Sequence, residues 1–190
     1  MKLSLRRIFE IPDMPREEVA RKVSEILQEH GDNMLGTIPT PEEVIKNPER
    51  YYVLYDMDSG DFIGVGAIRI RTGEIMKVVI KREYRGKGLG RFLLGMIIEE
   101  GIRNGVELFT VFVRKDNEAM RKLVESMGFE AICEHPKEDR VLIEYKLKIV
   151  PRTGRYASPT VPADPPPDPP EYEEEYEEYE EDYDYDSDTY

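Results

Sequence analysis

The most informative segment of the chain is Tyr84-Arg85-Gly86-Lys87-Gly88-Leu89-Gly90-Arg91, which follows a predicted strand and opens a predicted helix. Its three glycines allow a tight turn and a close approach of the backbone to a ligand. The first N–H groups of a helix have no partner inside the helix, and the positive end of the helix dipole lies there. Arg85, Lys87 and Arg91 add positive side chains. The segment therefore predicts a binding site for an anion such as a pyrophosphate.

Two familiar phosphate-binding loops do not fit this segment. A Walker loop requires the string G-x-x-x-x-G-K-[ST], which the chain lacks. A Rossmann fingerprint requires G-x-G-x-x-G after the first strand of a βαβ unit, whereas these glycines follow a series of strands. The alternative to an anion site is a helix start whose glycines serve packing alone, and the surrounding elements decide between the two.

The elements beside the segment have clear patterns. Three β-rich runs separated by turns, at 51–55, 61–71 and 74–81, predict an antiparallel meander. In the second run, alternate residues from Phe62 to Ile70 are expected to share one face. Apolar residues at helical spacing predict a helix from 89 to about 104, and the continuous apolar run at 106–113 predicts a strand that is buried on both faces.

Before residue 51 and after residue 113 the spacing of apolar residues again alternates between helical and strand patterns. Helical spacing predicts helices at 19–30 and 120–127 and a short helix at 40–46, while strands are expected at 3–8 and 140–149. The resulting order is β-α-α-β-β-β-α-β-α-β-β. We therefore expect an α/β (α+β) domain over 1–150, with a mixed central sheet of about seven strands flanked by about four helices.

Two local patterns point to a known family. The segment 85–90 matches R/Q-x-x-G-x-G/A, and about thirty residues later Asn117, Leu123 and Gly128-Phe129 match N-x-x-A-x-x-L…G-F in the same register. Through these residues the chain resembles the GNAT superfamily of N-acetyltransferases, whose first pattern binds the pyrophosphate of acyl-CoA. The resemblance extends over 1–150 and implies the GNAT fold and transfer of an acyl group from acetyl-CoA to an amine.

The resemblance also implies roles for individual residues. The strand before the loop would pair its backbone with the pantetheine arm, the loop would hold the pyrophosphate, and Asn117 would bind near the thioester end. The strand at 106–113 would diverge from the strand at 74–81 and leave a slot for the arm. The implied cofactor-binding residues are Val78, Val79, Ile80, Arg85, Gly86, Lys87, Gly88, Leu89, Gly90, Arg91 and Asn117.

The chemistry needs a base, because an amine attacks only when neutral and a lysine amine has a reference pKa of about 10.4. Glu74 is the candidate general base, since it begins the strand before the loop and resembles the catalytic glutamate of the histone-acetyltransferase branch. The alternative is a solvated carboxylate after a turn. Glu83 is less suitable as a base, because its position beside the loop is typical of a solvent-exposed carboxylate. A backbone N–H on the strand 74–81 would polarise the thioester carbonyl.

The general acid is less clear. The family pattern carries a tyrosine at the position of Val124, which has no proton to donate. Tyr84 is a candidate acid, as is a tyrosine among 51, 52 and 55, or the thiolate leaves unassisted. A fold that binds acyl-CoA without catalysing transfer is also compatible with this departure.

The charge of the chain is concentrated at its C-terminal end. The formal net charge is −13, yet residues 1–150 carry 25 basic and 26 acidic side chains, and 151–190 carry 2 and 14. Residues 151–170 contain eight prolines and predict an extended linker. Residues 171–190 hold twelve carboxylates and six tyrosines without an aliphatic side chain, which predicts a disordered acidic tail.

Composition excludes several other classes. We expect neither a membrane span nor a secretory leader, since no apolar run is long enough for a bilayer and residues 1–13 lack the apolar stretch and cleavage site of a leader. A near-neutral domain with an acidic tail should attract neither membrane nor nucleic acid. We therefore expect a cytoplasmic protein. One cysteine and two histidines predict no metal site. Cys133 is expected to be a small buried thiol, and His135 to lie in a turn before a proline.

The acceptor is the least determined part of the function. Residues 138–142 loosely resemble a segment of protein N-terminal acetyltransferases, although the tyrosine pair that usually precedes it is absent. We expect direct transfer to a primary amine within a ternary complex, with a protein lysine or N-terminal amine favoured and a small-molecule amine as the alternative. The acidic tail would recruit a basic protein or merely confer solubility. The contrasting class is a non-catalytic acyl-CoA-binding scaffold whose tail binds such a protein.

Overall fold

Strands and helices follow one another in the predicted order in the computed structural model, which describes residues 2–31 and 33–150. Single-turn 3-10 helices, at Pro48–Arg50 and Arg82–Tyr84, are added to this order. The predicted linker and tail lie outside the described residues. The elements are β1 (Leu3–Arg7), α1 (Arg16–His30), α2 (Pro41–Lys46), β2 (Tyr51–Asp56), β3 (Phe62–Arg69), β4 (Glu74–Ile80), α3 (Leu89–Arg103), β5 (Leu108–Arg114), α4 (Glu118–Ser126), β6 (Glu130–Pro136) and β7 (Val141–Lys148).

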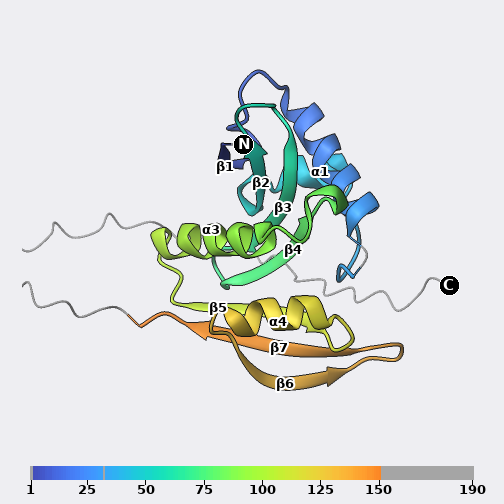
Figure 1. The fold of residues 1–190 in the computed structure, drawn as a ribbon, viewed down its shortest axis with the longest axis vertical. Helices are drawn as coiled ribbons and strands as arrows, with labels where there is room; N and C mark the ends of the chain where they lie inside the picture. Colours follow the sequence, from blue (N-terminus) through green and yellow to red (C-terminus); the bar gives the residue numbers. More distant parts are fainter. Residues whose placement is uncertain (1, 32, 151–190) are drawn as a thin grey trace, which may run out of the picture. The chain divides into compact units, whose positions relative to one another are not determined.

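The strands form one mixed sheet in the order β1-β2-β3-β4-β5-β7-β6 (Figure 1). Every neighbouring pair is antiparallel except β4 and β5, which are parallel. A parallel pair requires a crossover, and α3 supplies it between these two strands. The seven-stranded mixed sheet with four helices confirms the predicted fold class.

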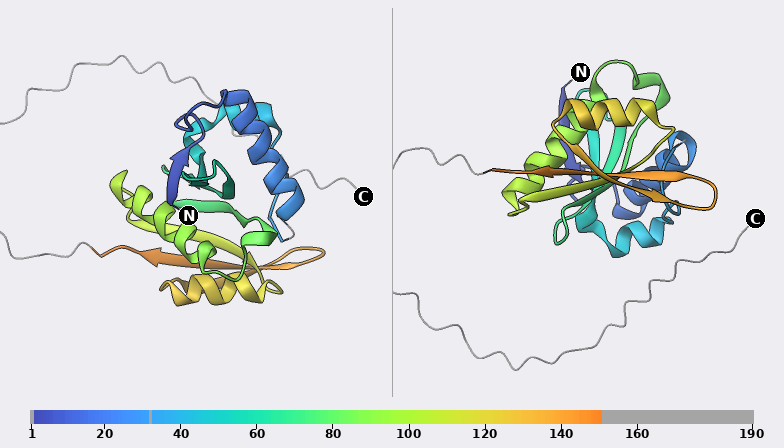
Figure 2. Two further views of the ribbon diagram at one scale, coloured as in Figure 1. Left: turned by 45° about the horizontal axis from the view of Figure 1, so that its top comes forward. Right: turned by 90° about the horizontal axis from the view of Figure 1, so that it is seen from below.

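The helices cover the sheet from both sides. Figure 2 shows α1 and α2 on one face and α3 and α4 on the other. Each face has its own apolar cluster: Val19, Val23 and Val65 belong to the cluster under α1 and α2, whereas Leu93 and Val124 belong to the cluster under α3 and α4. No helix within the described residues is long and apolar enough to cross a membrane.

Two strands differ from their sequence-based patterns. In β3 every residue from Phe62 to Ala67 is buried, so both faces of the strand are covered. Phe62 and Ile68 belong to different apolar clusters, so the prediction that alternate residues from Phe62 to Ile70 share one face is wrong. The reason is that α3 packs closely on one face, where a Cβ on Gly66 would meet the Ile97 side chain at 2.2 Å, while α1 covers the other. In β5 the expected burial on both faces is also wrong, because burial alternates and Leu108 is 45 % exposed.

A bulge interrupts β4 at its centre. Val65 pairs with Val79 but Ala67 pairs with Met76, so β4 contains one residue more than β3 between these positions. Lys77 has a positive φ of 58°, a conformation typical of bulges and costly for a residue with a side chain. Its Nζ donates to the carbonyl oxygens of Leu35 and Thr37 at 3.0 and 2.5 Å, and burial lowers its pKa. The segment between α1 and α2 thereby holds the bulge in place.

Candidate functional site

The central feature of the site is the place where β4 and β5 separate, called the fork below. The two strands pair only through Glu74 with Thr110 and Ile75 with Val111. The bulge at Lys77 follows two residues later and turns β4 away. Within the described residues, the edge of β4 beyond Ile75 has no strand partner on the β5 side. Unpaired backbone groups on such an edge can pair with an extended chain that carries amides.

The residues expected to line the pantetheine arm lie on this edge. Val79 and Ile80 are buried and Val78 is half-buried, with Val79 in the cluster under α1 and Ile80 in the cluster under α3. Their side chains are thus used for packing on the two faces, which leaves the backbone edge as the surface facing the fork. The backbone of these three residues is therefore the group left available at the fork, and their pairing with the pantetheine arm remains a prediction.

The glycine-rich loop connects this edge to α3. Gly86 and Gly88 both have a φ of 76°, and a Cβ at either position would meet no atom within 4 Å. The first backbone bond of α3 runs from the Phe92 N–H to the Gly88 carbonyl at 3.1 Å, while buried Leu89 fixes the helix start. The N–H groups of the first turn precede this bond and have no acceptor inside the helix, as an anion site at a helix N-terminus requires.

The arginines of the loop bind protein atoms. Arg85 donates through Nε to the Ile80 carbonyl at 2.9 Å and through Nη2 to the His30 carbonyl at 2.5 Å. Arg91 donates to the Ser126 hydroxyl at 2.7 Å and so links α3 to α4. Arg85 therefore holds the loop against β4 and α1, and Arg91 ties the start of α3 to α4. The backbone N–H groups of residues 86–91 remain the predicted ligand-binding groups.

Lys87 and Asn117 complete the predicted cofactor site. The Nζ atom of Lys87 lies 5.7 Å from the centre of the Tyr84 ring, and the lysine is exposed. Asn117 is the N-cap of α4, where its side-chain oxygen accepts the Met120 N–H at 3.2 Å. Capping uses only the amide oxygen, so the Nδ2 group remains a donor with no protein acceptor among the described residues.

Glu74 lies at the closed end of the fork. Its carboxylate forms an ion pair with Arg69 at 2.7 Å across the β3–β4 ladder, and its side chain is 27 % exposed. Ile75 faces the cluster under α3, and neighbouring residues of a strand point to opposite faces, so Glu74 points to the α1 face. The candidate base thus stands beside the fork but already has a cationic partner.

The candidate acid, Tyr84, does not lie beside the fork as Glu74 does. The Tyr84 hydroxyl donates to Asp61 at 3.5 Å, towards the turn between β2 and β3, on the side of β4 opposite to β5. Burial, with the nearby Asp61 and Glu83 carboxylates, raises the pKa of Tyr84. Val124, a residue of α4, is fully buried. Neither position brings an acidic proton towards the fork, and the role of Tyr84 remains a prediction.

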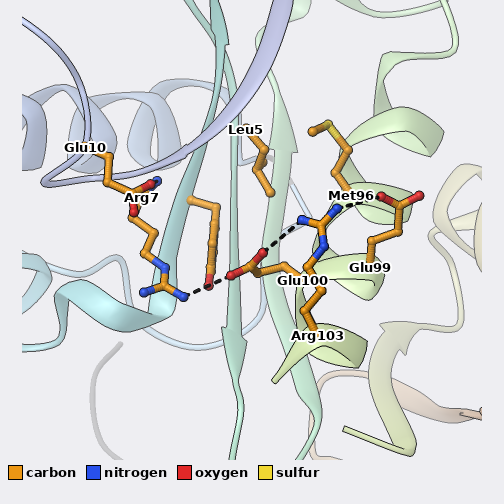
Figure 3. A pocket seen from close by; sticks show the side chains of 8 residues that line it. Leu5, Arg7, Glu10, Met96, Glu99, Glu100 and Arg103 are labelled. Atoms are coloured by element: carbon orange, nitrogen blue, oxygen red, sulfur yellow. Dashed lines mark hydrogen bonds and ion pairs between the residues drawn. The ribbon is translucent and has the colours of Figure 1, made fainter. Parts of the chain in front are cut away.

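A pocket of about 270 Å³ lies between β1, β2 and α3 (Figure 3). Glu100 accepts from Arg7 at 2.9 Å and from Arg103 at 3.4 Å, so the charges in the pocket largely pair with one another. Tyr52, considered above as an acid, lines this pocket and is 2 % exposed. The pocket lies beside β1, at the far edge of the sheet from β5, and is separate from the fork.

A cluster that the sequence did not reveal lies on β6 and β7. Cys133 is exposed and was wrongly expected to be buried, because it lies on the edge strand β6. His135 lies in β6 and not in a turn. Both contact Glu144 of β7, at 3.2 Å from Sγ and 2.8 Å from Nε2. Only the i, i+2 spacing of Cys133 and His135 was visible in the sequence, since the third member comes from the cross-strand register.

Comparison with known proteins places the chain in a family. The model of the acetyltransferase (GNAT) family matches residues 9–129, and the chain belongs to this family. An uncharacterized N-acetyltransferase, YobR of Bacillus subtilis, is 31 % identical over 85 residues, which are 45 % of this chain and 34 % of that protein. Mycothiol acetyltransferase of Corynebacterium aurimucosum is 33 % identical over 63 residues, which are 33 % of this chain and 21 % of that protein. The chain thus matches about a third or less of the length of these relatives.

Solved structures show the same fold at low identity. A putative acetyltransferase, yncA of Salmonella typhimurium, solved with its cofactor acetyl-CoA, has a TM-score of 0.63 and 19 % identity over 83 % of this chain and 100 % of that one. The ribosomal-protein-S18-alanine N-acetyltransferase of Escherichia coli has a TM-score of 0.57 and 19 % identity over 81 % of this chain and 99 % of that one. The GNAT fold is therefore established for the described residues.

Proposed function

We propose that the chain transfers an acetyl group from acetyl-CoA to a primary amine by direct attack within a ternary complex. The observation that carries this proposal is the continuous path formed by the fork and the glycine loop. The open edge of β4 beyond Ile75 leads directly to the N–H groups of residues 86–91. A ligand with amides at one end and a pyrophosphate at the other matches both parts of this path.

The residues present fit acetyl-CoA. The open positions at Gly86 and Gly88 leave room for phosphates, Asn117 offers an amide donor, and β4 offers backbone groups for the pantetheine amides. When bound, acetyl-CoA supplies an activated thioester. A backbone N–H of β4 near the bulge would donate to the carbonyl oxygen as negative charge develops there.

Glu74 would accept the proton of the acceptor amine, through a water molecule where the distance requires it. Its carboxylate lies at the fork on the α1 face, and Arg69 orients it. Since Val124 has no proton and Tyr84 faces Asp61, the thiolate would leave without a protein acid and take its proton from solvent.

The favoured acceptor is a lysine or N-terminal amine of a basic protein. The support is the excess of carboxylates in 171–190, which can attract a basic chain. The similarity to an alanine N-acetyltransferase concerns the fold alone, because its identity is 19 %. A small-molecule amine is the alternative acceptor. A scaffold without catalysis is the alternative function, favoured by Val124 at the position of the usual acid.

The decisive experiment is calorimetric titration of acetyl-CoA into the wild type, Gly88→Glu and Gly105→Glu. Gly105 is the matched control, because it also has a positive φ, of 84°, and open space around it, but lies at the opposite end of α3. Acetyl-CoA should bind the wild type and Gly105→Glu alike, and Gly88→Glu at least about tenfold more weakly, because a carboxylate in the loop repels phosphates. Equal binding to all three proteins would contradict the proposed site.

Acceptor preference then needs a direct assay for the product. Mass spectrometry would follow acetylation of a lysine-rich peptide, a peptide with a free N-terminus as its only amine, and a polyamine. Transfer to either peptide supports the favoured acceptor, and transfer to the polyamine alone supports the small-molecule alternative. Binding without transfer to any of them would favour the scaffold.

A further inference from the structure

The cluster of Cys133, His135 and Glu144 occupies one face of the β6–β7 pair. Cys133 and Glu144 are direct partners in the antiparallel register, and His135 follows Cys133 by two residues. Ile143 belongs to the apolar cluster under α3 and α4, and neighbouring residues of a strand point to opposite faces, so Glu144 points away from α4. The three side chains therefore meet on the opposite, partly exposed face, outside the predicted acetyl-CoA site.

Their polar atoms form a compact triangle. Cys133 Sγ lies 3.2 Å from His135 Nε2 and 3.2 Å from Glu144 Oε2, and Nε2 lies 2.8 Å from Oε2. A tetrahedral Zn²⁺ with bonds of about 2.0 to 2.3 Å needs its S, N and O ligands roughly 3.3 to 3.6 Å apart. Each edge of the triangle is thus a few tenths of an ångström short of that spacing, a difference that small side-chain rotations, above all of exposed Cys133, can supply.

The surroundings hold the triangle in position. The His135 ring packs edge-on against Phe112 of β5, with the ring centres 5.6 Å apart. Lys146 binds the other carboxylate oxygen of Glu144 at 2.8 Å and leaves Oε2 for the triangle. Side chains placed on paired strands are also more precisely positioned than side chains on loops.

Two features act against a cation. Lys146 places a positive charge beside the triangle, and the Cys133 thiol, which donates its proton to Glu144, must lose that proton when a metal binds. Thiolate and imidazole ligands overcome this cost with metals that prefer sulfur and nitrogen, whereas Mg²⁺ and Ca²⁺ prefer oxygen. The class of cation is therefore set by the ligand chemistry.

We propose that Cys133, His135 and Glu144 bind a divalent transition metal of the Zn²⁺ class, with a fourth position open to solvent. On binding, the Cys133 S–H bond breaks, its proton passes to solvent, and the sulfur lone pair forms the bond to the metal. Nε2 of His135 likewise gives the proton that it donates to Glu144 to solvent, while the neutral ring takes up a proton from solvent at Nδ1. Nε2 and Oε2 of Glu144 then donate the other two lone pairs, and no group is oxidised or reduced. The site does not depend on acetyl transfer.

Absorption spectroscopy with Co²⁺ as the probe tests this proposal on the full chain, kept reduced and free of chelators. Cys133 is the only cysteine of the sequence, so a thiolate-to-cobalt charge-transfer band in the near ultraviolet can arise from this residue alone. We expect this band to saturate at one Co²⁺ per chain and to disappear when Zn²⁺ is added. Carboxylates of residues 171–190 can bind Co²⁺ but cannot produce the band.

Variants identify the other two ligands. Cys133→Ser should abolish the band, and His135→Gln and Glu144→Gln should each weaken Co²⁺ binding about tenfold or more. His30→Gln is the control, because it removes the other histidine of the chain and should leave the titration unchanged. Far-ultraviolet circular dichroism verifies that each variant is folded. Absence of the band in the wild type would overturn the proposal, as would equal Co²⁺ affinity of the wild type, His135→Gln and Glu144→Gln.

Discussion

At the level of single residues, a basic side chain near a ligand site need not bind the ligand. Arg85 and Arg91 stand in the glycine loop, yet their side chains donate to the carbonyl of Ile80 and to Ser126. A guanidinium group has several donors in a planar fork and can bind two backbone carbonyls at once. The arginines thus support the loop and the helix start, whose backbone N–H groups are the predicted ligand-binding groups.

The role of Glu74 as general base is tested by the substitution Glu74→Gln. Glu74→Gln should lower kcat for acetyl transfer about 100-fold or more, because the variant cannot accept a proton, and should leave acetyl-CoA affinity unchanged. The free energy of unfolding should fall by less than about 1 kcal/mol, because the lost ion pair with Arg69 is partly exposed. Steady-state kinetics, calorimetry and urea unfolding measure the three quantities.

Glu83→Gln is the control for this substitution. Glu83 is exposed and lies in the 3-10 helix beside the loop, at the other end of β4. Its removal should leave kcat within about twofold of the wild type, as expected for a residue outside proton transfer. If Glu83→Gln lost acetyl-transfer activity while Glu74→Gln kept it, Glu83 would be the general base in place of Glu74.

At the level of elements, the fork depends on how β4 begins and where it bends. The turn before β4 ends at Gly73, whose carbonyl accepts the Thr110 N–H at 3.0 Å and so ties β4 to β5 at their closed end. The bulge at Lys77 then directs β4 away from β5. A short parallel pairing followed by a bulge therefore separates β4 from β5 and opens the sheet.

Gly73→Ala should disturb this closed end. A Cβ at Gly73 would lie 2.0 Å from the Leu108 carbonyl oxygen, which is backbone, and its φ is 71°. We expect the free energy of unfolding to fall by about 3 kcal/mol or more, since a steric clash adds to a backbone strain of roughly 1 to 2 kcal/mol. Urea unfolding measures the difference from the wild type.

Gly105→Ala provides the comparison. Gly105 also has a positive φ, of 84°, but a Cβ there meets no atom within 4 Å. Only the strain of about 1 kcal/mol should remain. If both variants lost the same free energy of unfolding, the backbone would have moved to avoid the clash with Leu108, and the close packing of Gly73 would not hold the closed end of the fork.

At the level of the whole molecule, the domain is near neutral while the last forty residues hold almost all of the net charge. Recruitment of a basic acceptor by that segment would act through long-range attraction, which salt screens. The segment lies outside the described residues, so its role is argued from sequence alone and tested by deletion.

Removal of residues 151–190 should raise KM for a basic protein acceptor severalfold at low salt and leave acetyl-CoA affinity unchanged. The difference in KM should shrink as salt is added, because screening weakens the attraction in the complete chain. A chain whose carboxylates in 171–190 are replaced by amides is the control for length. Kinetics at two salt concentrations measures the effect, and an unchanged KM at low salt would contradict recruitment by the tail.

Much of the fold was predictable from local patterns. Apolar spacing in α3 and α4, turns around Gly73 and Gly128, and the glycines at 86–90 are encoded within short windows, so the order of elements and the family followed from them. Burial in β3 and β5 was not predictable in the same way. It depends on which helices cover each face, and that information lies far away in the sequence.

The sequence by itself determined the family and the order of the elements, because both depend on patterns of neighbouring residues. Patterns of the same kind predict the anion site at the start of α3 and the boundary before the acidic segment. The tertiary structure alone decided which side chains meet. Arg85 contacts His30, Glu74 contacts Arg69, and Cys133 meets Glu144 through strand pairing. The physical reason is that register and bulges, set by packing of the whole sheet, determine the face on which each side chain lies.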